Sequence, residues 1–63
     1  MLKNNEYNIM MQIVEEHKSL WRIKNEYMKD SESDEETKAF WEHLAKEKES
    51  HIEKLTKMIK ERL

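Results

Sequence analysis

The sequence has 63 residues, of which 41% are charged, and a formal net charge of −2. A chain this short forms at most one small domain, which is marginally stable without help, usually from disulfides, a metal or self-association. The absence of cysteine excludes disulfides and thiolate metal sites. Mixed charge argues against a nucleic-acid partner, and no apolar run is long enough to span a membrane. The N-terminus lacks the apolar core of a secretory signal, so we expect a cytoplasmic protein.

The first predicted element is a helix over residues 5–29. Glycine and proline, which β-rich folds need for turns and bulges, do not occur in the sequence. Apolar residues instead recur three and four positions apart, which indicates an amphipathic helix. Written as heptads, the inward positions are Met10, Ile13, His17, Leu20, Lys24 and Tyr27.

An acidic turn is predicted over residues 30–33, followed by a second helix over 34–61. Ser33 and Glu36 fit a capping box, with Ser33 as the N-cap and Glu36 at the third helical position. The predicted inward positions of this helix are Trp41, Leu44, Lys48, His51, Leu55 and Met58, flanked by Phe40, Ala45, Ile52 and Ile59.

The predicted fold class is all-α, a single antiparallel two-helix hairpin over residues 1–63. Two helices alone leave their wide apolar faces wet, and such patches favour association. We therefore expect a homo-oligomer, either a two-fold dimer that forms a four-helix bundle or a larger ring. The predicted interface residues are Met10, Ile13, Val14, Leu20, Trp21, Phe40, Trp41, Leu44 and Leu55.

Polar residues interrupt both apolar seams at the same level of the expected hairpin. His17, Lys48 and His51 would form one layer, with Glu16 and Glu47 beside it. Imidazole and carboxylate groups suit iron, zinc or manganese. Alternatively, the layer binds no metal and only fixes the register and oligomeric state. The candidate metal ligands are Glu16, His17, Glu47 and His51.

Residues 38–51, KAFWEHLAKEKESH, resemble the second helix of a rubrerythrin-type half in the ferritin-like superfamily. That helix carries Glu-x-x-His, and residues 15–21, EEHKSLW, are similar to the first helix. The length of the hairpin also resembles the two-helix protomers of encapsulated ferritins, which build an iron site across an interface. The resemblance implies that His51 is a ligand. The glutamate position three residues earlier holds Lys48, whose ammonium group would repel Fe²⁺.

The sequence therefore predicts a non-enzymatic, self-assembling helical hairpin without a cofactor, either a degenerate ferritin-like unit or a small interaction module. The alternative is a ferritin-like iron-binding or ferroxidase protein with its metal site, for iron or zinc, between protomers. No catalytic residue is predicted, because adjacent Ser50 and His51 point apart on a helix and form no nucleophile–base pair.

Overall fold

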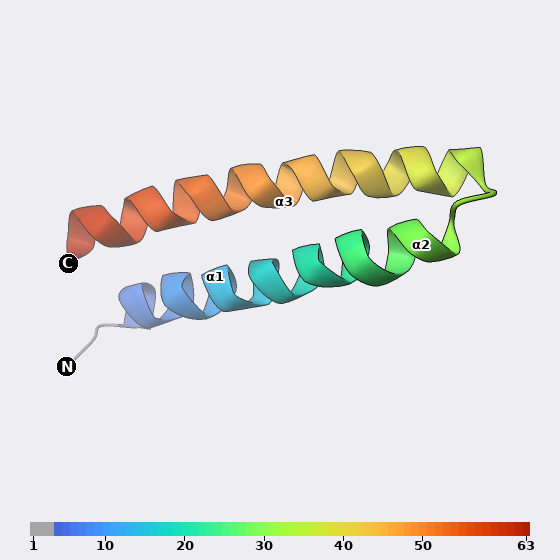
Figure 1. Cartoon of the computed structure of the whole chain (residues 1–63). Helices are drawn as coiled ribbons and strands as arrows, with labels where there is room; N and C mark the ends of the chain where they lie inside the picture. The colour runs from blue at the N-terminus through green and yellow to red at the C-terminus, as the bar shows by residue number, and fades with distance from the viewer. Residues whose placement is uncertain (1–3) are drawn as a thin grey trace.

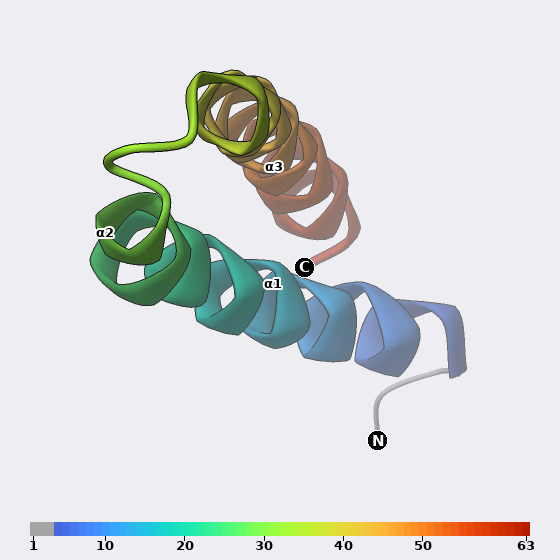
Figure 2. The ribbon, with the colours of Figure 1, turned by 90° about the vertical axis from the view of Figure 1, so that its right-hand side faces the viewer.

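The computed structural model describes residues 4–63 as helices joined by a single turn. Helix α1 spans Asn4–Arg22 and continues without a break through a π-helix, η1, at Ile23–Tyr27 and a last turn, α2, at Met28–Asp30. Helix α3 spans Glu35–Arg62. The α1–α2 segment and α3 lie side by side (Figure 1) and are inclined to one another (Figure 2). The predicted all-α class is confirmed for these residues.

The observed helix ends lie one residue from the predicted ends. Residues 5–29 and 34–61 were the predicted helices, and the structure gives Asn4–Asp30 and Glu35–Arg62. An ion pair of 3.2 Å between Glu6 and Arg62 joins the start of α1 to the end of α3.

Within residues 4–63, no helix is both long and apolar enough to span a membrane.

The N-cap of α3 is Asp34, and the prediction of Ser33 was wrong. Asp34 has extended backbone angles, and its carboxylate accepts a hydrogen bond of 3.2 Å from the Thr37 backbone N–H. Serine and aspartate are about equally good N-caps, so the sequence alone did not separate the two positions. A charged cap also gains from the helix dipole, which favours the aspartate. Glu35 and Glu36 then lie in the first turn of α3.

Replacing Asp34 with alanine is expected to lower the free energy of unfolding by about 1 kcal/mol, because a helix N–H group loses its partner. The matched control is Ser33→Ala, which should change the stability by no more than about 0.5 kcal/mol. Urea unfolding followed by circular dichroism measures both values. A larger loss in the Ser33 variant would contradict the assigned cap.

The core is a narrow seam between α1 and α3. Its buried apolar residues are Ile9, Ile23, Ala45 and Ile59, and only Ile23, at 1% exposure, is fully buried among the described residues. Tyr27 packs against Trp41 near the turn, with their rings tilted by 44° and their centroids 4.9 Å apart. The inward positions of the first helix are Ile9, Ile13, Glu16, Leu20, Ile23 and Tyr27, and those of α3 are Trp41, Ala45, Lys48, Ile52, Leu55 and Ile59.

Three of the six predicted inward positions were therefore wrong on the first helix, and one of six, the exposed His51, was wrong on α3, where Leu44 and Met58 are half-buried. In the first helix Met10, His17 and Lys24 are exposed, and Ile9, Glu16 and Ile23 replace them at the seam. In α3 the positions predicted as flanking residues, Ala45, Ile52 and Ile59, also face α1. The first helix is thus rotated about its axis relative to the predicted arrangement, whereas the inward face of α3 is widened toward the positions predicted to flank it.

The π-helix η1 lies where α1 passes the aromatic pair. In this wider turn, the Met28 N–H donates a hydrogen bond to the carbonyl of Ile23, five residues earlier. The side-chain amide of Asn25 donates a 2.9 Å hydrogen bond to the carbonyl of Trp21 just before it. This bond provides a partner for a backbone carbonyl at the junction, where the regular hydrogen-bond ladder is disturbed.

Candidate functional site

The outer side of α1 carries a second apolar face. At about 100° per residue, its centre lies about 145° around the helix from the face that packs on α3. Trp21 and Tyr7 are the most exposed of its members, at 58% and 55%. Polar or charged residues are expected on this side of a helix in a two-helix protein. We call this surface the outer stripe; its residues are Tyr7, Met10, Met11, Val14 and Trp21.

Phe40 is the exposed apolar residue at the turn end of α3. It is 56% exposed, and its ring meets that of Trp41 edge to face, with centroids 5.3 Å apart. Trp41 in turn packs on Tyr27. One side of this aromatic cluster is therefore held in the seam while Phe40 faces solvent.

Glu16 is a buried carboxylate in the middle of the seam, with 6% of the residue exposed. Gln12 donates a 3.0 Å hydrogen bond to its Oε1. The Lys48 ammonium nitrogen lies 3.2 Å from Oε2, and the His51 Nδ1 lies 3.8 Å from the same oxygen. Oε2 has no well-directed hydrogen bond, so Lys48 acts on it mainly through its charge.

Two opposing effects set the pKa of Glu16. Burial of the carboxyl group would raise the pKa, since it disfavours the charged form. The hydrogen bond from Gln12 and the contact with Lys48, assisted by His51, outweigh burial and hold the pKa of Glu16 below its ordinary value of 4.5. The carboxylate is therefore ionised at neutral pH, and the Glu16–Lys48 contact is an ion pair.

This lowered pKa predicts the pH dependence of folding. A carboxyl group whose pKa is lower in the folded state stabilises the fold above its unfolded pKa, and this stabilisation is lost as the pH falls through the folded pKa. We expect the free energy of unfolding to fall as the pH drops below about 4.5, and to fall less in Glu16→Gln.

Chemical denaturation at pH 6 and pH 3, at one protein concentration, measures this difference. The control is Glu53→Gln, which removes an exposed carboxylate on α3. An identical pH dependence in Glu16→Gln and Glu53→Gln would contradict the role assigned to Glu16.

The structure brings together only some of the predicted metal ligands. Glu16 and His51 approach each other, whereas His17 is exposed on α1. Glu47 instead pairs with His43 one turn away on α3, at 2.8 Å. Within residues 4–63, no three histidine, aspartate or glutamate side chains are grouped so that they could hold a metal ion. A site completed by a second protomer stays a prediction.

Lys48 on α3 is the cationic partner of Glu16. Its ammonium nitrogen is the nearest cationic atom to the buried carboxylate. A hollow lined by Gln12, Glu16, His51, Lys54, Leu55 and Met58 opens next to this cluster. The cluster is thus a lysine–glutamate ion pair at the edge of a solvent-facing hollow.

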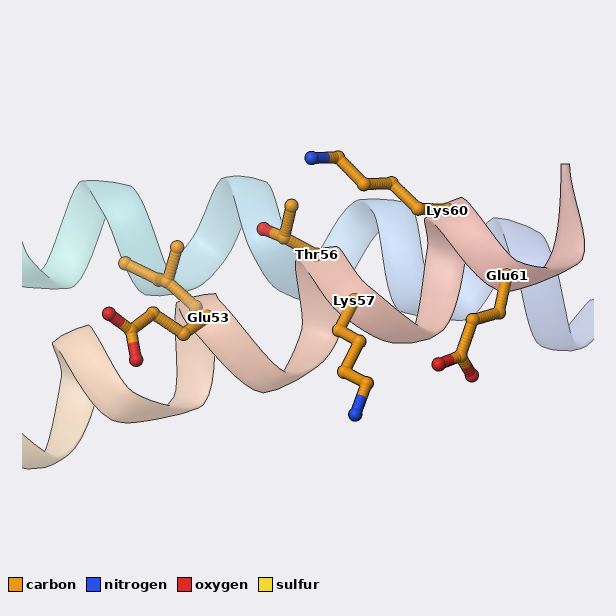
Figure 3. A pocket seen from close by; sticks show the side chains of 6 residues that line it. Glu53, Thr56, Lys57, Lys60 and Glu61 are labelled. Carbon is orange, nitrogen blue, oxygen red and sulfur yellow. The ribbon is translucent and has the colours of Figure 1, made fainter.

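A second hollow lies on the C-terminal half of α3, and its charged side chains do not point toward a common centre (Figure 3). It is lined by residues of α3 alone: Ile52, Glu53, Thr56, Lys57, Lys60 and Glu61. Figure 3 shows the side chains of Lys57 and Lys60 extending away from each other. The charged groups there are arranged as on an ordinary solvated helix face.

The predicted interface residues fall into two groups. Met10, Val14, Trp21 and Phe40 are exposed. Ile13, Leu20, Trp41, Leu44 and Leu55 are half-buried between or beside the two helices of the chain. The sequence analysis did not single out Ile23, although it lies three residues after Leu20 and four before Tyr27, which is the spacing of a continuous apolar seam.

Comparisons with known proteins add no identification: no family model, no curated protein and no solved structure matches this chain. The resemblance to the ferritin-like superfamily therefore stays a prediction based on the residues of the sequence.

Proposed function

We propose that this chain is a non-enzymatic, self-associating antiparallel helical hairpin that acts as a small assembly module. The observation that carries the proposal is the outer stripe of α1, an apolar face turned away from α3. A helix that is apolar on two sides is expected between two neighbours, and the chain itself provides only one. A second copy provides the other, and the dimer then contains four helices.

The exposed area of the chain supports this proposal. A folded monomer of 7.8 kDa is expected to expose about 4,400 Å². This chain exposes 5229 Å², because its helices form a rod with extents of 48 × 15 × 13 Å. The excess of several hundred Å² is of the order of the ~800 Å² that each partner buries in a stable protein–protein interface.

The core of a single chain is too small to make association unnecessary. Four apolar residues of the described chain are buried, and one of them is an alanine. Domains of fewer than about 70 residues rarely obtain more than about 3–5 kcal/mol from one core. Burying Trp21 and Tyr7 against a second copy adds stabilisation where this core is small.

Replacing Trp21 with glutamate tests the proposal, because it puts a charge in the outer stripe without touching the seam. The matched control is Asn8→Glu, which adds the same charge to α1 about 140° around the helix from Trp21. We expect Trp21→Glu to sediment at the mass of one chain while Asn8→Glu keeps the mass of the unmodified protein. Equal association of both variants would contradict the assignment of the outer stripe as the interface.

A further inference from the structure

The outer stripe is nearly symmetrical about Val14. Tyr7 lies seven residues before Val14 and Trp21 lies seven residues after it. Seven residues are about two helical turns, so both rings lie on the same side of α1, about 10 Å along the helix from Val14. Both rings are more than half exposed. A surface with this spacing is complementary to its own copy turned end for end.

We propose that two copies pack α1 against α1 in antiparallel orientation, with the two-fold axis passing beside Val14. This inference rests on the self-association proposed above and adds the helix, the orientation and the register of the contact. Val14 meets Val14 of the partner subunit at the axis. Tyr7 stacks on Trp21 of the partner subunit at one end, and the symmetry repeats this contact at the other end.

Other antiparallel registers cover less of the stripe. A register that pairs Trp21 with its own copy places Tyr7 opposite position 35, beyond the end of the first helix at Asp30. A register that pairs Tyr7 with its own copy moves Trp21 past the start of α1 at Asn4. Either arrangement leaves one large aromatic side chain of each copy in water. The dimer then loses the burial of about 150–250 Å² that such a side chain provides. The register centred on Val14 covers both.

A parallel arrangement would also pair the aromatic positions but brings like charges together. Lys18 borders the stripe and is exposed, with 60% of its side chain accessible. In a parallel dimer it would lie beside Lys18 of the partner subunit, and the helix dipoles would also be aligned. The antiparallel register instead places the carbon stem of Lys18 on the methionine end of the partner's stripe, where long side chains cover apolar surface well.

The chain has no cysteine, so single cysteine variants report the register directly. Facing Cα atoms of two helices packed about 8–10 Å apart come within about 4–5.5 Å, which a disulfide can span. We expect Val14→Cys to form disulfide-linked dimers on mild oxidation as the main product. Glu15→Cys is the control, since its side chain is turned about 100° around the helix, and it should give little cross-linking.

A mixture of Tyr7→Cys and Trp21→Cys chains tests the orientation independently of Val14. Mass spectrometry separates the mixed disulfide from the two homodimers. We expect the mixed product to predominate. Predominance of the homodimers would overturn the antiparallel arrangement in favour of a parallel one.

Sedimentation of the unmodified protein separates the two levels of the proposal. A dimer in which neither Val14→Cys nor the mixed pair cross-links preferentially would overturn the register and leave self-association standing. A monomer at all concentrations would overturn the register and the proposed function together.

Discussion

Replacing Lys48 with methionine is expected to lower the free energy of unfolding by about 3 kcal/mol, because it leaves the Glu16 carboxylate buried without its cation. The Glu16 side chain is 8% exposed and that of Lys48 is 23% exposed. The expected cost lies at the lower end of the range for buried pairs, since water reaches the lysine side of the contact. Denaturant unfolding of the two proteins at one concentration measures the difference.

The chain offers a matched control for this change. Lys24 and Glu49 also pair across the two helices, at 2.9 Å, but both side chains are more than half exposed. Lys24→Met should therefore cost no more than about 1 kcal/mol. The double variant Glu16→Leu and Lys48→Met removes both charges and should recover most of the stability lost in Lys48→Met. Equal costs for Lys48→Met and Lys24→Met would show that Glu16 does not depend on Lys48.

Truncating Ile23 to alanine is the second large expected effect. Ile23 is 1% exposed at the start of the π-helix, and no other side chain of residues 4–63 is as fully buried. Loss of a buried isoleucine side chain to alanine costs about 2–5 kcal/mol, through lost burial and the cavity left behind. A core of this size supplies a similar amount in total, so the alanine variant should be largely unfolded.

A graded series keeps this prediction measurable. Ile23→Val removes one methylene and should cost about 0.5–1.5 kcal/mol, which leaves a folded protein whose unfolding can be followed. Urea unfolding should therefore show a small loss of stability in the valine protein, and circular dichroism should show the alanine protein largely unfolded without urea. An alanine variant as stable as the unmodified protein would contradict the position of Ile23 at the centre of the seam.

The helices and the turn could be predicted because several local signals agreed. The absence of glycine and proline, the spacing of apolar residues and the acidic segment before residue 35 all favour two helices at these positions. The predicted and observed ends differ by one residue. Local signals of this kind depend on neighbours in the sequence, so they need no knowledge of tertiary packing.

The rotation of the first helix could not be predicted as well, because this helix is apolar on two sides. One heptad series contains Met10, His17 and Lys24, and the other contains Ile9, Glu16 and Ile23; both share Ile13, Leu20 and Tyr27. The second series has only one polar member, Glu16, and Lys48 neutralises it from α3. The smaller number of polar members was therefore a sequence signal for the second series, but accepting the charged Glu16 inside the seam required knowledge of its cross-helix partner.

The candidate site was predicted in part for the same reason. The sequence placed Lys48, His51 and Glu16 at one level of the hairpin, and the structure brings these three side chains together. His17 was expected beside them because the wrong face of α1 was turned inward. The rotation that buries Glu16 exposes His17 and turns Val14 and Trp21 away from α3. The same rotation therefore replaces the predicted histidine layer with an ion pair and creates the outer stripe.

Sedimentation equilibrium of the unmodified protein, from micromolar to millimolar concentration at neutral pH, tests the central claim most directly. Our account predicts a reversible monomer–dimer equilibrium whose upper limit is twice the chain mass of 7.8 kDa. A limiting mass of three or more chains would contradict the isologous contact, because a two-fold interface closes at two copies. A mass of 7.8 kDa throughout the concentration range would contradict self-association itself.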